Sequence, residues 1–220
     1  KSGDADALKH KALLFRVTAV LEEGKRAAYM TDLEPEEQDY LDELHLLSAK
    51  PILYVLNKKA DAVNLDEGGT HEGAEKFNAL MSYLDSVPDE YVFVDAGIEH
   101  ELKDLGGEDR DEFRKELGGQ TESGIDKLIR KSFQLLGLIT FFTTGEKETR
   151  GWTIEEGSTA PEAGGAIHSD FQDTFIKAEV IQWARLLDLG SYAAARTAGA
   201  VRTEGKEYVV CDGDVIIFKV

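Results

Sequence analysis

The chain has 220 residues and a mass of 24.3 kDa, which suffices for one large domain or two modest ones. Its 42% hydrophobic and 9% aromatic residues provide apolar surface for a folded core, so disordered and collagen-like classes fit poorly. The formal charge of −18 repels a phosphate backbone, and any contact with nucleic acid must therefore be local.

Cysteine content and targeting signals limit the cellular setting. Cys211 is the only cysteine, which excludes an internal disulfide and a paired-thiolate zinc site, and we expect a reducing, cytosolic environment. The sequence has no signal-peptide core and no run of about 18 apolar residues that would predict a membrane-spanning helix. It starts at Lys1 without a methionine and soon enters a helical pattern, so we expect the true N-terminus to lie elsewhere.

The first fifty residues predict two amphipathic helices. Apolar residues recur at three- and four-residue steps in a helix that Asp4 is expected to cap and Gly24 to end. A second helix is predicted to open at Pro35, because proline is favoured at a first helical position. Its apolar face is expected to comprise Tyr40, Leu44 and Leu47.

A βαβ unit follows. Residues Ile52 to Leu56 are apolar without alternation, which predicts a strand buried on both faces of a parallel sheet. A helix over residues 77–84 and a second buried strand over Tyr91 to Val94 complete the unit. Ligands of open α/β sheets bind beyond the carboxyl ends of the strands, so Asn57 and Asp95 to Gly97 mark a potential ligand edge.

Two further helices are predicted before a change of pattern at Gly137. The first is charged, spans about Glu108 to Leu117 and is closed by Gly118-Gly119. The second opens at a capping box of Ser123 and Asp126. Its core-facing side is expected to comprise Leu128, Ile129, Phe133 and Leu136.

After Gly137 the sequence predicts a small mixed sheet with packed helices. The Asp212-Gly213 pair predicts a two-residue hairpin turn between the last two strands. Short helices are expected at Ala160 to Ala166 and at Ser191 to Ala198. The expected strands are Leu138 to Phe142, Thr149 to Ile154, Thr174 to Val180, Tyr208 to Val210 and Val215 to Phe218.

A search for catalytic motifs finds no self-contained active site. The chain lacks the phosphate-binding G-x-x-x-x-G-K-[ST] loop, G-x-G-x-x-G, H-E-x-x-H and G-x-S-x-G, and its five histidines show no metal-ligand spacing. The best local candidate is Asn57, whose amide offers an acceptor and a donor to a purine edge or else simply caps a turn.

Three other side chains have a functional and a structural interpretation. Trp152 alternates with Arg150 on a strand and is suited to stacking on a base or, more commonly, to packing in a core. His168 suits catalysis, an RNA contact or a structural loop position. Cys211 is interpreted as an inert small side chain, and the acidic stretch from Glu101 to Glu116 as a solvated helix face.

Three long motifs stand out in the C-terminal part of the chain: FFTTGEKETRGWTI at 141–154, AIHSDF at 166–171 with FIKAEVI at 175–181, and GKEYVV at 205–210 with DGD at 212–214. Together they resemble the C-terminal TGS domain of the YchF family, the Obg-like ATPases. The resemblance extends upstream through Lys50-Pro51 to Asn57, through Asp111-Glu112-Phe113, and to the first helix, so that it covers essentially the whole chain.

The resemblance implies a fold class of α/β plus α+β. Residues 1–49 would form part of a helical coiled-coil insertion, and 50–136 the C-terminal part of a P-loop GTPase-like nucleotide domain. Residues 137–220 would form a ubiquitin-like β-grasp TGS domain. The phosphate loop, switch regions and magnesium ligands would all precede Lys1, so no catalytic residue is expected here and the chain alone is expected to be inactive.

The resemblance also implies a function in translation or stress regulation. The family binds and hydrolyses ATP, sometimes GTP, with Mg²⁺ and associates with ribosomes, so ATP or GTP and the ribosome are the expected partners, in the cytoplasm, without membrane or sequence-specific DNA. Asn57 would be the base-contacting residue of an Asn-x-x-Glu motif, and Ala96 and Gly97 would lie in the loop over the base. The glutamate position falls on Ala60, and Asp61 comes one residue late, which leaves the nucleotide preference open.

The alternative function is a non-enzymatic TGS module that binds ribosomal protein or structured RNA. A third interpretation takes the TGS domain as that of a threonyl-tRNA synthetase or a guanosine-polyphosphate synthetase. It ranks low because those enzymes should not join such a domain directly to a strand that ends in Asn57.

Overall fold

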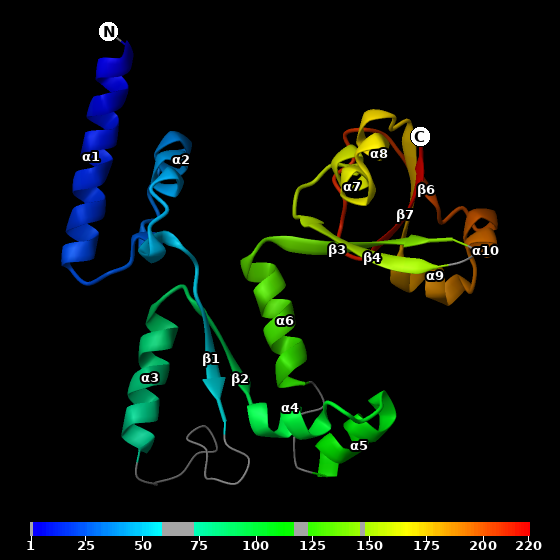
Figure 1. The fold of residues 1–220 in the computed structure, drawn as a ribbon, viewed down its shortest axis with the longest axis horizontal. Coiled ribbons are helices and arrows are strands. Elements are labelled where there is room, and N and C mark those ends of the chain that lie inside the picture. The colour runs from blue at the N-terminus through cyan, green and yellow to red at the C-terminus, as the bar shows by residue number, and fades with distance from the viewer. Residues whose placement is uncertain (1, 59–72, 117–122, 146–147) are drawn as a thin grey trace. The chain divides into compact units, whose positions relative to one another are not determined.

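The computed structural model describes the chain apart from residues 1, 59–72, 117–122 and 146–147 (Figure 1). The chain divides into two compact units, Lys1–Lys131 and Ser132–Val220, which are described separately. The predicted helix closure at Gly118-Gly119 and the motif positions Ala60 and Asp61 lie outside the described residues.

The first unit opens with a helical segment. It comprises α1 (Ser2–Glu22), a 3-10 turn (Ala27–Tyr29), α2 (Pro35–Glu43) and a second 3-10 turn (Leu47–Ala49). The buried side chains of the segment are Leu13, Val17, Ala27 and Leu41.

Two details of this segment differ from expectation. The first helix begins at Ser2, so Asp4 lies within it instead of capping it. The second helix opens at Pro35 as predicted but ends at Glu43, because His45 adopts a left-handed backbone (φ 49°) that a helix cannot continue through. Leu47 therefore leaves the predicted apolar face and is 82% exposed.

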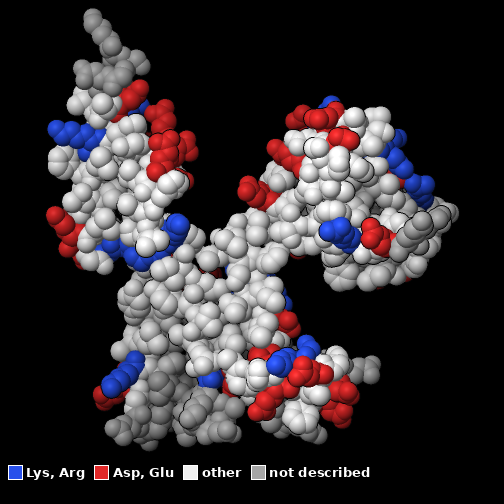
Figure 2. Space-filling model, in the orientation of Figure 1, with Lys and Arg blue, Asp and Glu red and all other residues white. Residues whose placement is uncertain are grey.

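The predicted βαβ unit is confirmed. Strand β1 (Leu53–Asn57) pairs in parallel with β2 (Glu90–Val94), and α3 (Ala74–Ser86) connects them. The prediction that β1 is buried on both faces is wrong, since Val55 is 47% exposed in a sheet of two described strands. Figure 2 shows few charged side chains over this sheet, whereas acidic ones gather over α2. Exposed apolar side chains on the helices that follow β1 and β2 include Leu80, Tyr83, Ile125 and Ile129.

In the described residues between β2 and β3 there are three helices, of which the sequence predicted two. The unpredicted helix is α4 (Ala96–Leu102), so Ala96 and Gly97 form a helical first turn and not the loop that was expected. The predicted helices are α5 (Gly107–Glu116) and α6 (Gly124–Leu135). The core-facing side expected for α6 is only partly right: Leu128 and Phe133 are half-buried, whereas Ile129 and Leu136 are exposed.

The second unit is a five-stranded mixed sheet with the order β4-β3-β7-β5-β6. The first and last strands in sequence lie next to each other and parallel, as in a β-grasp sheet. The strands are β3 (Leu138–Thr144), β4 (Thr149–Glu155), β5 (Lys177–Gln182), β6 (Arg202–Glu204) and β7 (Asp214–Lys219). The helices are α7 (Ala160–Ile167), α8 (Ser169–Asp173), α9 (Trp183–Leu189) and α10 (Tyr192–Thr197).

Helices cover both faces of this sheet. Ala160 and Ala163 of α7 pack in one core with Phe141 and Ile216 of the sheet, while Ala195 of α10 packs in a second core. The helices predicted at Ala160 and Ser191 are confirmed within a residue or two, whereas β6, α8 and α9 were not predicted.

The predicted hairpin at Asp212-Gly213 is wrong. Strand β7 is already paired with β5 on one side and β3 on the other, so the segment at Tyr208 to Val210 makes only an isolated bridge from Val209 to Thr159. The Asp212-Gly213 pair instead forms a tight turn with Gly213 at φ +80°, and that turn bonds to Thr140 of β3 through two hydrogen bonds of 2.8 Å.

Gly151 in β4 gives a stability prediction. A Cβ there would lie 3.5 Å from the Phe142 ring and from Thr140, which is ordinary contact, so Gly151→Ala adds packing and restricts the unfolded chain. We expect a gain of about 0.5–1 kcal/mol in the free energy of unfolding. Denaturant titration measures it, with Gly164→Ala as control, since a Cβ at Gly164 would lie only 3.2 Å from Phe171. An equal or larger gain at Gly164 would contradict the packing argument.

Candidate functional site

The predicted ligand edge brings together residues that are far apart in the sequence. Asn57 ends β1, and its Oδ1 accepts a hydrogen bond of 3.1 Å from the backbone N–H of Ala96. The N–H of Lys58 donates to the carbonyl of Val94 at 2.7 Å, which continues the pairing of the two strands by one residue. The amide of Asn57 is therefore oriented by the chain that leaves β2.

Asp95 forms the first helical cap at this edge. Its Oδ1 accepts from the N–H of Ile98 at 3.0 Å, which makes Asp95 the N-cap of α4. The carboxylate thereby fixes the direction in which the chain leaves β2, and with it the position of the Ala96 N–H. The sequence analysis placed Asp95 at the end of the strand and did not predict its capping role, although aspartate is a common N-cap residue.

The other candidate side chains take structural positions. Trp152 packs against the core of the second unit, donates from Nε1 to Thr143 Oγ1 at 2.9 Å, and has the Arg150 guanidinium 4.2 Å from its ring centroid. These contacts favour the core interpretation over base stacking. His168 caps α8 by accepting from the Asp170 N–H at 3.2 Å, and Cys211 is exposed.

The described residues give two findings about metals and membranes. Outside the gaps at 59–72, 117–122 and 146–147, no group of three His, Cys, Asp or Glu side chains is placed to hold a metal ion. In the same part of the chain, no helix is long and apolar enough to cross a membrane.

At the opposite ends of β1 and β2 lies a polar cluster that the sequence did not predict. Arg26 Nη1 donates to both carboxylate oxygens of Asp89 at 2.6 Å, and its Nη2 donates to the carbonyl of Lys50. Tyr29 donates from its hydroxyl to Asp89 Oδ2 at 2.7 Å. Since Lys50 precedes β1 and Asp89 precedes β2, this cluster fixes the helical segment to the start of both strands.

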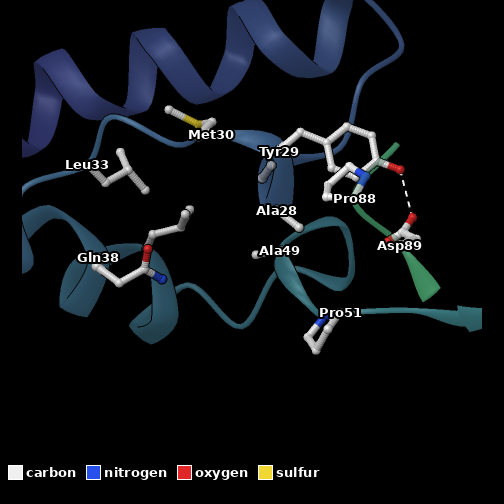
Figure 3. Close-up of a pocket in the computed structure, with 11 residues that line it drawn as sticks. Ala28, Tyr29, Met30, Leu33, Gln38, Ala49, Pro51, Pro88 and Asp89 are labelled. Atoms are coloured by element: carbon white, nitrogen blue, oxygen red, sulfur yellow. Dashed lines mark hydrogen bonds between the residues drawn. The ribbon is translucent and has the colours of Figure 1, made fainter. Parts of the chain in front are cut away.

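Beside this cluster lies a cavity of about 250 Å³ (Figure 3). Tyr29 and Asp89 form one wall, and Gln38 of α2 lies across from them. The side chains of the remaining lining residues are apolar. The lining residues are Ala27, Ala28, Tyr29, Met30, Leu33, Gln38, Leu41, Ala49, Pro51, Pro88 and Asp89.

Tyr29 gives a prediction at alkaline pH. Burial, followed by the hydrogen bond to Asp89, raises the pKa of Tyr29 to about 12 from the ordinary 10.0. The neutral phenol therefore stabilises the folded unit fully below about pH 10, and this contribution is lost as the pH rises through about 12. A titration followed by phenolate absorbance should show one fewer tyrosine that ionises well above pH 10 in Tyr29→Phe than in the wild type. An unchanged number of such tyrosines would contradict the raised pKa of Tyr29.

Comparison with known proteins decides the family. The family model YchF-GTPase_C, described as "Protein of unknown function (DUF933)", matches residues 138–220. A curated "Ribosome-binding ATPase YchF" of Bacillus subtilis (strain 168) is 45% identical over 219 residues, which is 100% of this chain and 58% of that protein. A solved structure of the Schizosaccharomyces pombe YchF GTPase matches with a TM-score of 0.82 at 31% identity, over 96% of this chain and 54% of that chain. This chain belongs to the YchF family, the Obg-like ATPases.

The YchF relatives are longer than the chain. It corresponds to their C-terminal portion and spans about 58% of the Bacillus protein. An "Obg-like ATPase 1" of Caenorhabditis elegans is 36% identical over 209 residues, covering 94% of this chain and 50% of that protein. The second unit of the structure contains the region of the YchF C-terminal family, whose TGS-like domain the motifs had predicted.

Proposed function

We propose that this chain is the C-terminal portion of a ribosome-associated YchF-type ATPase or GTPase that acts in translation or stress regulation in the cytoplasm. In this proposal the chain supplies the base-binding edge of the nucleotide domain and a TGS domain. The observation that carries the proposal is the edge at Asn57 and Ala96, two residues that meet at the carboxyl ends of parallel strands. The names of the curated relatives, a ribosome-binding ATPase and an Obg-like ATPase, agree with it.

The chemistry of the edge suits a purine. Since Asn57 Oδ1 accepts from the Ala96 N–H, the amide is held in one orientation, and its Nδ2 can donate to a ring nitrogen of the base. Gly97 follows Ala96 in the first turn of α4, where the absence of a side chain allows a flat base to approach the backbone. We assign base contact to Asn57, Ala96 and Gly97, and leave the choice between ATP and GTP to experiment.

Hydrolysis is assigned to residues outside the chain. Phosphoryl transfer needs a phosphate-binding loop and Mg²⁺ to stabilise the transferring group, and the sequence contains no phosphate-loop motif. The chain matches 58% of the Bacillus ATPase, and in this proposal the phosphate loop and the Mg²⁺ ligands belong to the portion of the protein that precedes Lys1. The exposed apolar side chains around β1 and β2 are consistent with further strands from that portion.

The domain assignment follows the same proposal. Residues 1–49 would be part of the helical coiled-coil insertion, 50–136 the last part of the nucleotide domain, and 137–220 the TGS domain. A TGS module that binds ribosomes without nucleotide turnover is the second candidate. The observation that favours it is the second unit, which has a five-stranded sheet and cores of its own.

Nucleotide binding by the full-length protein that contains this chain tests the proposal. We expect Mg²⁺-dependent hydrolysis of ATP or GTP, and about tenfold weaker nucleotide binding in Asn57→Ala. Asn78→Ala on the exposed side of α3 is the control. The 220-residue chain alone should show no turnover. Ribosome co-sedimentation that added nucleotide does not change, together with no effect of Asn57→Ala, would favour the binding module.

A further inference from the structure

The carboxylate of Glu99 joins two helices beside the Asn57 edge. Its Oε1 accepts hydrogen bonds of 2.9 Å from the Ser123 hydroxyl and 2.9 Å from the Gly124 N–H. Ser123 is buried, and its hydroxyl oxygen in turn accepts from the N–H of Ile125 at 3.1 Å. The predicted cap of α6 at Ser123 is thus present. The Glu99 carboxylate of α4 adds a further acceptor at the start of that helix.

The start of α6 is seated on the end of β2. A Cβ at Gly124 would lie 3.1 Å from Val94 Cα and 3.2 Å from the Phe93 carbonyl, so only glycine allows this approach without a shift. The first residue of α6 is therefore a fixed point beside the last residues of β2. The hydrogen bond between the Gly124 N–H and Glu99 therefore holds α4 against the start of α6.

The hydrogen bond from Gly124 to Glu99 affects the contact between Asn57 and Ala96. Glu99 and Ala96 are three residues apart on α4 and so lie on the same side of the helix. With seven residues, α4 is too short to be stable on its own, and tertiary contacts must set its direction. If α4 tilts, the Ala96 N–H moves away from Asn57 Oδ1 and the amide loses the partner that orients it.

We propose that Glu99 is a positioning residue for the base-binding edge. It holds the first turn of α4 so that the Ala96 N–H keeps the Asn57 amide in its base-contacting orientation. This inference rests on the proposed nucleotide function of that edge, and it adds a residue that makes no contact with the base itself.

Binding of ATP and of tripolyphosphate to the full-length protein separates a positioning role from a general structural one. Tripolyphosphate has no base, so a change at the base edge leaves its affinity unaltered. In Glu99→Ala we expect ATP to bind about tenfold more weakly while tripolyphosphate binds as before. Glu99→Gln retains an acceptor oxygen for the Gly124 N–H and should restore most of the ATP affinity. Glu101→Ala, at an exposed position on the same helix, should change neither affinity.

The outcomes distinguish this inference from the proposed function. If Asn57→Ala weakens ATP binding and Glu99→Ala does not, the positioning role is overturned while the base-binding edge stands. Equal loss of ATP and tripolyphosphate affinity in Glu99→Gln, which keeps the hydrogen-bond acceptor, also overturns it. If wild-type protein binds ATP no more tightly than tripolyphosphate and Asn57→Ala changes nothing, the proposed function itself fails.

Discussion

Asp214→Ala is expected to destabilise the second unit by about 3–5 kcal/mol, enough to unfold a domain of ordinary stability. Asp214 is fully buried at the start of β7. Its Oδ2 accepts from the Tyr208 hydroxyl at 2.7 Å and the Cys211 N–H at 2.9 Å, and its Oδ1 accepts from Gln182 Nε2 at 2.9 Å. Removing the carboxylate takes an acceptor from all three donors, of which only Gln182 Nε2 keeps another bond, to the carbonyl of Asp212 at 3.1 Å.

The surroundings of Asp214 reinforce this expectation. Arg202 approaches Asp214 Oδ1 at 3.9 Å and donates to the Tyr208 hydroxyl at 2.8 Å, so a cation partly offsets the buried charge. Burial raises the pKa of Tyr208, and the hydrogen bond to Asp214 raises it further. The network also anchors the segment between β6 and β7, which is otherwise held by the bridge from Val209 to Thr159 and by the hydrogen bonds of the Asp212-Gly213 turn to Thr140.

Thermal and denaturant unfolding followed by circular dichroism measure the effect of Asp214→Ala. Asp173→Ala at an exposed position of α8 is the matched control and should change stability by less than about 0.5 kcal/mol. Tyr208→Phe removes one donor and should cost about 1 kcal/mol. An Asp214→Ala protein as stable as the Asp173→Ala control would show that the network contributes nothing to folding.

Features that depend on local pattern were predictable from the sequence. The apolar runs before Asn57 and Asp95 indicated two parallel strands, and the rule that such strands end at one edge placed Asn57 near Ala96. The helix α4 was missed because it has only seven residues, in which a single apolar pair, Ile98 and Leu102, gives a weak helical pattern, although Asp95 gave its capping signal. The proximity of Asn57 and Ala96 was therefore predicted correctly, whereas the helical conformation of Ala96 was not.

Features that depend on long-range pairing were not predictable. Asp212-Gly213 is a strong local hairpin signal, but β7 pairs with β3 and β5, which are distant in sequence, and the local signal is overridden. The contact between Arg26 and Asp89 spans 63 residues, and no pattern in a single sequence relates the two. The hydrogen bond from the Gly124 N–H to Glu99 depends likewise on the close approach of α6 to β2.

Asp89→Ala is expected to destabilise the first unit by about 3 kcal/mol. The Asp89 side chain is only 5% exposed, and removing it leaves the Arg26 guanidinium and the Tyr29 hydroxyl without their acceptor. Because Arg26 also donates to the carbonyl of Lys50, the starts of both strands lose their link to the helical segment. Loss of this link should lower protection of the β1 and β2 amides from hydrogen exchange.

The pH dependence of this effect gives a second measure. Burial alone would raise the pKa of Asp89, but the hydrogen bonds from Arg26 and Tyr29 outweigh it and lower the pKa below its ordinary 3.8. The ionised carboxylate therefore stabilises the folded unit above about pH 4, and this contribution is lost as the pH falls through the lower folded value. The stability difference between wild type and Asp89→Ala should accordingly shrink in acid.

A double-mutant cycle with Arg26→Ala isolates the pair. We expect Arg26→Ala and Asp89→Ala each to cost nearly as much as the double variant, because either change removes the same contact. Asp85→Ala, at an exposed position of α3, is the control and should leave both stability and its pH dependence unchanged. Strictly additive effects of Arg26→Ala and Asp89→Ala, or a difference that stays constant into acid, would rule out the ion pair as the link between the helical segment and the two strands.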